Sequence, residues 1–372
     1  MLQYEKKQDE KIPHILVLEP YYGGSHKAFL QDLATWLPWR LDSLTLPARK
    51  WKWRMRLAAP YFAEKLKKFS RERYRNFTAI LCSTFVDVAT FRSMAPSWTR
   101  NLPLHVYFHE NQFAYPVQAD DERDFHFALT NFTTALAADR LAFNSCFNME
   151  SFLNGVRDLM KISPDMKLDG YEEVIRRKSV VIHPGIDFSG IDAARQTEEN
   201  DRSIPTIVWN HRWEHDKNPE LFFKTLYRLD EEGIDFSLVV LGESFKRKPQ
   251  IFEDAKKRLS RRILHFGYVE SRQEYYSLLK KCSLVVSTAV HEFFGISVIE
   301  AVRSGCRPLL PSRLSYPELF PDRYLYADDI DFLEHLKNSL AQGPLSPATA
   351  VKFTEPFSWV TLEKSYREWF AC

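Results

Sequence analysis

The chain has 372 residues, of which 45% are hydrophobic and 27% are charged, so it is long enough for two ordinary domains and has a globular composition. Its formal net charge of +2 favours no class of partner by itself. The five cysteines include no close pair, which argues against a disulfide framework and a zinc site. Residues 1–11 lack the apolar core of a signal peptide, and no apolar stretch approaches the roughly 20 residues of a membrane span. We therefore expect a cytoplasmic protein without a membrane association.

The first half of the chain alternates short apolar strands with helical patterns. Strands are predicted at His14–Leu18, Ala79–Cys82, Leu104–Phe108, Arg140–Phe143 and Val180–Ile182. The clearest helical patterns between them cover Asp124–Ala138 and Ser145–Met160. Short continuous apolar strands separated by helices indicate a parallel sheet covered on both faces. We therefore predict a doubly wound α/β domain over residues 1–190.

A glycine pair follows the first predicted strand, in the segment Tyr21-Tyr-Gly-Gly-Ser-His26. Adjacent glycines before a helix let a ligand approach the backbone closely, so we predict that Gly23 and Gly24 contact a ligand. The segment is not the dinucleotide fingerprint G-x-G-x-x-G, and many turns between a strand and a helix contain glycine.

Residues 49–75 contain eleven basic residues and only two acidic ones. Such a local excess is typical of a face that binds a polyanion. At its start cations alternate with tryptophans, a pattern suited to phosphate contacts and to stacking on unpaired bases. We predict that these residues contact a nucleic acid: Arg49, Lys50, Trp51, Lys52, Trp53 and Arg54. Two alternatives remain: buried tryptophans with a solvated charged face, and a membrane-binding amphipathic helix over Leu57–Phe69.

Four polar residues follow the strand Leu104–Phe108: His109, Glu110, Asn111 and Gln112. Open α/β sheets bind ligands at the carboxyl ends of their strands, so we expect these side chains at a ligand site. The next acids, Asp120-Asp-Glu122, could suggest a metal site. We interpret them instead as acids that complement the dipole of a helix N-terminus, and we predict no metal site.

A polar stretch, Phe188–Ile204, is the predicted linker to a second α/β domain over residues 205–350. The predicted strands of this domain are Thr206–Trp209, Phe236–Leu241, Ile263–Phe266, Leu284–Ser287 and Pro308–Leu310. Its predicted helices are Pro219–Glu231, Ile251–Leu259, Gln273–Lys280 and Gly295–Ser304. Residues 351–372 are expected to form a C-terminal helix that packs back toward the first domain. Two such domains in tandem predict a ligand site between the carboxyl ends of their sheets.

The strongest motif is His291-Glu-Phe-Phe-Gly-Ile-Ser-Val-Ile-Glu300, which follows a predicted strand and opens a helix. Gly295 lets the backbone approach a ligand, and the free amides of the new helix suit a diphosphate. Carboxylates are pure acceptors, so Glu292 and Glu300 suit the hydroxyls of a sugar and a ribose. The alternative is that both glutamates are merely solvated, which we would favour if the two glutamates stood eight residues apart without the flanking Phe-Gly.

The second motif of this domain is Trp209-Asn-His-Arg-Trp-Glu-His-Asp-Lys217, directly after its first strand. Arg212 and Lys217 would project from the carboxyl end of that strand and neutralise a diphosphate leaving group. An ordinary cationic loop is the alternative.

With these motifs in place, the second domain resembles the retaining glycosyltransferases of family 4, which have the GT-B fold of two facing Rossmann-like domains. A closer resemblance covers nearly the whole chain. The segments YYGGSHKAF, LPARKWKWR, YFHENQFAYPV, WNHRWEHDKNPE and STAVHEFFG are similar to those of the tRNA-queuosine mannosyltransferase family.

That resemblance implies transfer of mannose from GDP-mannose to queuosine, the wobble base of tRNA(Asp). We expect no cofactor and no obligate protein partner. Because the sequence offers cationic side chains and a helix start but no cluster of metal ligands, we also expect no strict metal requirement. It implies that Arg212 and Lys217 hold the diphosphate and that Glu300 binds the ribose. It places Glu292 at the donor sugar, His109 at the position of the family's active-site histidine, and the Phe294 and Gly295 amides at the donor. Gly23 and Gly24 would also contact the donor. Two alternatives stay open: another hexose donor or a lipid or glycan acceptor, and a non-catalytic RNA-binding module.

Overall fold

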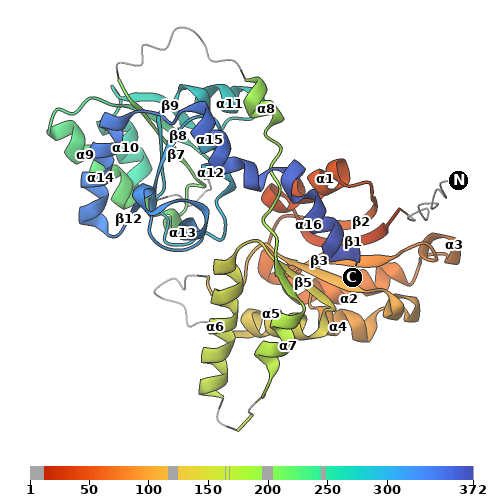
Figure 1. The fold of residues 1–372 in the computed structure, drawn as a ribbon. Helices are drawn as coiled ribbons and strands as arrows, with labels where there is room; N and C mark the ends of the chain where they lie inside the picture. The colour runs from red at the N-terminus through yellow and green to blue at the C-terminus, as the bar shows by residue number, and fades with distance from the viewer. Residues whose placement is uncertain are drawn as a thin grey trace, which may run out of the picture. The chain divides into compact units, whose positions relative to one another are not determined.

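The computed structural model describes residues 12–115, 125–163, 165–166, 168–194, 204–243 and 249–371. The chain divides into two compact units, Met1–Gly185 with Leu362–Cys372 and Ile186–Thr361. Each unit contains a six-stranded sheet in which every pairing is parallel (Figure 1). Among the described residues, no helix combines the length and the apolar character needed to cross a membrane.

The sheet of the first unit has the strand order β2-β1-β3-β4-β5-β6. Its strands are β1 (His14–Tyr22), β2 (Arg40–Pro47), β3 (Ala79–Ser83), β4 (Leu104–Phe108), β5 (Arg140–Phe143) and β6 (Ser179–Val181). The inner strands β3 and β4 are buried along their whole length, as expected for a sheet covered on both faces. The edge strand β2 alternates half-buried and exposed residues, which is why its sequence lacks the continuous apolar run of the others.

The helices of this unit are α1 (Gly24–Trp36), α2 (Trp51–Leu66), α3 (Arg71–Tyr74), α4 (Val88–Met94), α5 (Phe125–Ala137), α6 (Cys146–Ile162), α7 (Tyr171–Arg177) and the greater part of α16 (Trp359–Ala371). The last helix is held by buried contacts, because Tyr366 donates its hydroxyl to the His183 carbonyl at 2.9 Å. The ring of His105 in β4 also lies against Phe370, with centroids 4.2 Å apart. The end of the chain is therefore part of the first unit's core.

The sheet of the second unit has the order β12-β11-β10-β7-β8-β9. Its strands are β7 (Thr206–Asn210), β8 (Ser237–Leu241), β9 (Ile263–Gly267), β10 (Leu284–Val286), β11 (Arg307–Pro311) and β12 (Leu325–Tyr326). Its helices are α8 (Ser189–Ala193), α9 (Pro219–Glu231), α10 (Ile251–Arg258), α11 (Arg272–Lys281), α12 (Ile296–Arg303), α13 (Tyr316–Leu319), α14 (Asp329–Gln342) and α15 (Pro347–Thr354).

Successive residues of β7 face two different helix layers in the second unit. Trp209 packs in the cluster formed with α9, α10 and α14, whereas Val208 packs in the cluster formed with α8, α11, α12 and α15 (Figure 1). This alternation is the reason for the continuous apolar strands in the sequence. The predicted doubly wound α/β class is confirmed in both units.

Two segment boundaries differ from the sequence-based expectation. The predicted linker begins within the second unit, because Ile186, Phe188 and Ile191 are buried in its core; residues 195–203 lie outside the described residues. The chain end forms two helices, α15 and α16, with Pro356 between them, since proline cannot continue a helix. The acids Asp120-Asp-Glu122 also lie outside the described residues. The predicted ligand site between the two domains stays a prediction.

Candidate functional site

Two loops of the second unit meet because the strands that precede them are neighbours. β7 pairs with β10, so the segments that follow both strands start at the same sheet edge. The backbone carbonyl of Asp216 accepts hydrogen bonds from Val290 N–H at 2.9 Å and from His291 N–H at 3.3 Å. Thr288 donates its hydroxyl to the Lys217 carbonyl at 2.8 Å. The sheet topology thus brings together the two motifs that the sequence places about seventy residues apart.

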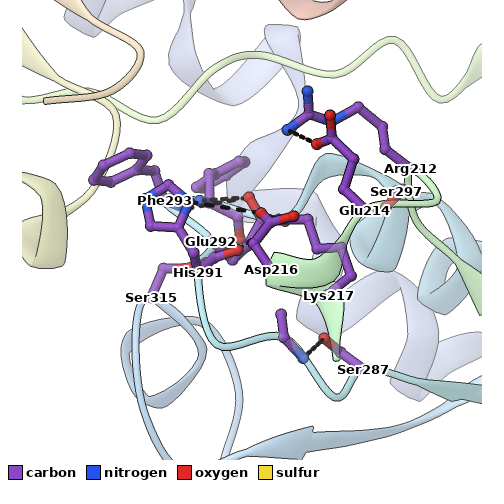
Figure 2. Close-up of polar contacts among 12 residues, drawn as sticks. Arg212, Glu214, Asp216, Lys217, Ser287, His291, Glu292, Phe293, Ser297 and Ser315 are labelled. Carbon is purple, nitrogen blue, oxygen red and sulfur yellow. Dashed lines mark hydrogen bonds and ion pairs between the residues drawn. The ribbon is translucent and has the colours of Figure 1, made fainter. Parts of the chain in front are cut away.

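Lys217 lies at the centre of this cluster, with only 5% of its surface exposed (Figure 2). Its Nζ is 3.2 Å from Asp216 Oδ2 and 3.3 Å from Glu292 Oε2, and it also donates to the His291 carbonyl. An ammonium group has three donors, so these three partners account for all of them. In this state Lys217 holds Glu292 in place.

Both carboxylates of the cluster are held in the ionised form. Burial alone would raise the pKa of Asp216, but a hydrogen bond from His291 and the charge of Lys217 lower it well below its usual range. Burial also opposes ionisation of Glu292, whose pKa is nevertheless lowered, chiefly by Lys217. Glu292 Oε1 accepts the backbone N–H of Phe293 at 3.1 Å. The Glu292 carboxylate is therefore charged and fixed in direction.

Arg212 differs from Lys217 although the two share one loop. Its side chain is 51% exposed and pairs with Glu214 at 3.1 Å (Figure 2). An exposed ion pair of this kind is worth little, so the guanidinium can leave Glu214 for a stronger anion at small cost. Of the two predicted phosphate ligands, Arg212 is the more accessible one.

The entry to α12 is shaped by Gly295, which has a φ of +97°. A side chain there would be strained, and its Cβ would lie 3.3 Å from Tyr316. The preceding amide, Phe294 N–H, points to Glu292 Oε1 at 3.4 Å. The predicted contacts of these two amides with a donor stay a prediction.

Glu300, in the second turn of α12, is held by residues from two other elements. Tyr275 of α11 donates its hydroxyl to Glu300 Oε2 at 2.7 Å, and Asn210 at the end of β7 donates to the same hydroxyl oxygen at 2.7 Å. Neither Tyr275 nor Asn210 was singled out from the sequence, where no local signal links them to Glu300. His211 was missed as well; burial lowers its pKa to about 4, so it stays neutral beside the Lys217 cluster.

In the first unit, His109 at the end of β4 lies against a second histidine. The ring centroids of His109 and His26 are 4.1 Å apart. His26 Nδ1 is 3.1 Å from Glu19 Oε2, and Glu19 is buried within β1, three residues before the strand ends. The sequence-based site omitted both His26 and Glu19, although a charged residue directly after an apolar strand was a usable signal.

The pKa values of the two histidines are shifted in opposite directions. Burial, and then the charge of His26, hold the pKa of His109 well below its ordinary value. Burial also acts to lower the pKa of His26, but the Glu19 and Glu110 carboxylates raise it above the ordinary value. His109 is therefore a neutral imidazole, able to donate one hydrogen bond and accept another.

The polar residues after His109 have different surroundings. Asn111 is completely buried: its Nδ2 donates to Asn148 Oδ1 at 2.9 Å, and its Oδ1 accepts the N–H of Phe113 and of Ala114 at 3.0 Å each. Asn111 therefore fixes the loop, and its predicted contact with a ligand stays a prediction. Glu110 and Gln112 are half-buried.

The glycine pair lies between β1 and α1. Gly23 is extended and caps α1, and a Cβ on it would approach Ala48 Cβ to 2.5 Å. Gly24 begins the helix with a φ of +51°. Both positions therefore favour glycine for reasons of backbone packing and conformation, and donor contacts at them remain a prediction.

Residues 49–54, which we call the basic segment, lead into the first turn of α2. The two tryptophans of this segment have different surroundings. Trp51 is half-buried, with its ring centroid 5.1 Å from that of Phe127, whereas Trp53 is 64% exposed. A surface hollow of about 380 Å³ is lined by Arg49, Lys50, Trp53 and Arg54. We call Arg49, Lys50, Lys52, Trp53 and Arg54 the basic face; Lys52 is exposed beside them.

Known proteins resemble this chain in sequence and in fold. The family described as tRNA-queuosine alpha-mannosyltransferase N-terminal matches residues 14–186, and the family described as Glycosyl transferases group 1 matches residues 191–324. A tRNA-queuosine alpha-mannosyltransferase of Drosophila melanogaster is 37% identical over 321 residues, which cover 84% of this chain and 83% of that protein.

Solved structures with low sequence identity share the fold. A sucrose-phosphate synthase from Thermosynechococcus elongatus has a TM-score of 0.69 at 14% sequence identity. The match covers 97% of this chain and 100% of the synthase chain. Anabaena HepE in complex with UDP has a TM-score of 0.66 at 13% sequence identity. The match covers 96% of this chain and 99% of the HepE chain. These similarities confirm the predicted GT-B fold.

Proposed function

The chain belongs to the tRNA-queuosine alpha-mannosyltransferase family and is a glycosyltransferase, and from this premise we propose that it transfers mannose from GDP-mannose to the queuosine wobble base of tRNA(Asp) with retention of configuration. The proposal includes a cytoplasmic location and no obligate protein partner. The observation that carries it is the similarity to the Drosophila enzyme over most of both chains. The ordered charges around Lys217 supply the chemistry that such a transfer needs.

The nucleotide-sugar donor is assigned to the second unit. Arg212 binds the diphosphate, and the amides at the start of α12 support it through the positive end of the helix. Glu292, fixed by Lys217, accepts hydrogen bonds from mannose hydroxyls. Glu300 accepts hydrogen bonds from the ribose.

In the proposed reaction, the bond between the mannose anomeric carbon and the diphosphate oxygen breaks while the bond to a queuosine hydroxyl oxygen forms on the same face. The hydroxyl proton passes to the departing diphosphate, and GDP leaves. Arg212 stabilises the charge that develops on the leaving group. The neutral imidazole of His109 contacts the sugar without adding a positive charge beside the developing oxocarbenium ion.

We propose that this transfer does not strictly require a divalent metal, because Arg212 and the helix start supply positive charge at the diphosphate. Within the described residues no group of three or more His, Cys, Asp or Glu side chains is placed to hold a metal ion. Loss of activity in EDTA that magnesium restores, with the folding of the tRNA held constant, would contradict this point.

The tRNA is assigned to the basic face of the first unit. Trp53 is exposed at the start of α2, and Leu57 and Tyr61 continue the exposed apolar positions along the same helix at intervals of four residues. Exposed cations lie directly before two of these positions, at Lys52 and Arg56. Such a surface binds RNA through two kinds of interaction: phosphate contacts made by the cations and stacking of Trp53 on a base.

A transfer assay with matched substrates tests the proposal. Purified protein is incubated with GDP-mannose and either tRNA(Asp) that contains queuosine or the same tRNA with guanosine at that position, and the nucleosides are analysed by mass spectrometry. We expect one hexose on queuosine only, released by an alpha-mannosidase. Absence of that product, or equal transfer from UDP-hexoses or to a glycan or lipid acceptor, would overturn the assignment. RNA binding without any transfer would indicate the non-catalytic alternative.

A further inference from the structure

A directed chain of hydrogen bonds ends at Glu300. Asn210 Nδ2 donates to the Tyr275 hydroxyl oxygen and also to the Ser297 carbonyl, at 2.7 Å and 3.1 Å. A carbonyl can only accept, so the second bond fixes which atom of the Asn210 amide is the nitrogen. The Tyr275 oxygen therefore receives a hydrogen from Asn210, and its own hydrogen is committed to Glu300 Oε2 at 2.7 Å.

The surroundings of Tyr275 favour this one arrangement. Burial, and then the Glu300 carboxylate, raise the pKa of Tyr275 well above its ordinary value, so the hydroxyl keeps its proton and stays a donor at neutral pH. Asn210 is 5% exposed, and breaking its bonds would leave a buried amide without partners. The direction of the Glu300 carboxylate is thus set by elements outside its own helix.

The same network reaches the diphosphate loop. Ser297 in the first turn of α12 donates its hydroxyl to the Asn210 carbonyl at 2.7 Å, and Asn210 is the last residue of β7, directly before the loop that carries Arg212. One set of bonds therefore connects the strand end, the start of α12 and the carboxylate of Glu300.

We propose that Tyr275 is a positioning residue for nucleotide recognition: it holds Glu300 so that the remaining lone pairs of the carboxylate receive the ribose hydroxyls, and it thereby makes the site selective for ribonucleotides. A carboxylate has about four lone-pair sites. Tyr275 occupies one of them at Oε2, and the exposed Arg272 lies 4.0 Å from Oε1, so the carboxylate can accept two ribose hydroxyls when a nucleotide binds. The proposal rests on the proposed function, in which Glu300 binds the ribose of the donor.

The test compares Tyr275→Phe with Tyr276→Phe. Each change removes one hydroxyl from neighbouring residues of α11, but the Tyr276 hydroxyl accepts from Arg272 Nη1 at 3.0 Å. It is connected to Glu300 only indirectly, through the exposed Arg272, whose Nη1 lies 4.0 Å from Glu300 Oε1. Calorimetry measures the affinity of each protein for GDP and for 2′,3′-dideoxy-GDP. We expect wild type to prefer GDP, and Tyr275→Phe to bind GDP roughly tenfold more weakly with little change for the dideoxy nucleotide. Tyr276→Phe should keep the wild-type ratio of the two affinities.

Each other outcome has a definite meaning. Equal weakening of both nucleotides by Tyr275→Phe would overturn positioning and leave only a packing role, and unchanged affinity for both would overturn it as well. A wild-type protein that binds both nucleotides equally would show that Glu300 does not bind the ribose, so the proposed site assignment itself would fail. In a Glu300→Gln background, Tyr275→Phe should cause little further loss of GDP affinity; a full additional loss would contradict action through Glu300.

Discussion

The Lys217 cluster and the basic face are both rich in charge, but they differ in how far the protein itself satisfies that charge. Lys217 is 5% exposed and paired with two carboxylates and a carbonyl, whereas Trp53 on the basic face is 64% exposed among cations. A small ligand needs groups that are already in position, because reorganisation costs affinity. A large polyanion can be bound by exposed groups through counterion release. Substitutions in the first region should therefore affect folding and catalysis together, and those in the second should affect binding alone.

The largest effect is expected for Lys217→Ala. It leaves the half-buried carboxylates of Asp216 and Glu292 without their counter-ion, and we expect a cost at the lower end of the range of about 3–5 kcal/mol found when one member of a buried charge pair is removed. We expect the free energy of unfolding to fall by this amount at pH 7 and transfer activity to be lost. Urea denaturation and steady-state kinetics measure the two effects.

The loss of stability in Lys217→Ala should depend on pH. In wild type the pKa values of Asp216 and Glu292 are lowered by Lys217, so the pairing stabilises the fold above the unfolded carboxyl pKa and is lost as pH falls through the folded values. The difference between wild type and variant should therefore stay nearly constant from pH 7 down to about pH 5 and shrink as pH falls below the unfolded carboxyl pKa values of about 4. A difference that shrinks already between pH 7 and about pH 6, or that persists unchanged below about pH 3, would contradict the assigned charge pairing.

Arg212→Ala should separate catalysis from stability. Its side chain is half-exposed and its partner Glu214 is also accessible, so the free energy of unfolding should change by less than about 0.5 kcal/mol. Loss of one electrostatic contact to the leaving group should lower kcat by roughly 100- to 1,000-fold. Near-normal kinetics with GDP-mannose would show that Arg212 does not contact the diphosphate.

The fold was predictable because alternating strands and helices leave a strong pattern when both faces of a sheet are buried. The strand β2 was missed because it is a half-exposed edge strand. Helix α14 was also missed, although Asp328 caps it and accepts the backbone N–H of Ile330 and Asp331. An aspartate at the N-cap position is a common sequence signal for the start of a helix.

The candidate site was only partly predictable for a different reason. Arg212, Lys217, Glu292 and Glu300 belong to contiguous motifs, but the residues that hold them come from elsewhere in the chain. Tyr275 precedes Glu300 by 25 positions, and Asn210 precedes Tyr275 by 65. Only the sheet order places them together, and no local periodicity encodes such a contact. The fold also brings Glu19 and His26 to His109; here the contact with His109 was not predictable, although the charge of Glu19 directly after an apolar run was a usable signal.

The two tryptophans of the basic segment test the same contrast, between a side chain packed within the protein and one exposed for binding, with a smaller expected effect. Trp51 packs against Phe127, so Trp51→Ala should lower stability. Trp53 is exposed, so Trp53→Ala should leave stability unchanged and weaken tRNA binding by about 1–3 kcal/mol if the ring stacks on a base. Equilibrium unfolding and filter binding of queuosine-containing tRNA distinguish the two. Unchanged tRNA affinity in Trp53→Ala would exclude stacking by this ring.

The smallest effect is expected for single cations of the basic face, and it is visible only as a salt dependence. Lys52 is exposed at the start of α2, and a phosphate contact there releases about one counterion when tRNA binds. Lys52→Ala should therefore reduce the slope of log affinity against log salt by about one and weaken binding most at low salt. Lys364→Ala is the matched control, because this lysine of α16 has an 84% exposed side chain and only a distant ion pair with Glu368 at 3.7 Å. Replacing tRNA by anionic lipid vesicles in the same buffer tests the membrane alternative. If Lys52→Ala and Lys364→Ala give the same slope as wild type, or if vesicles bind more tightly than tRNA, the basic face does not bind the RNA.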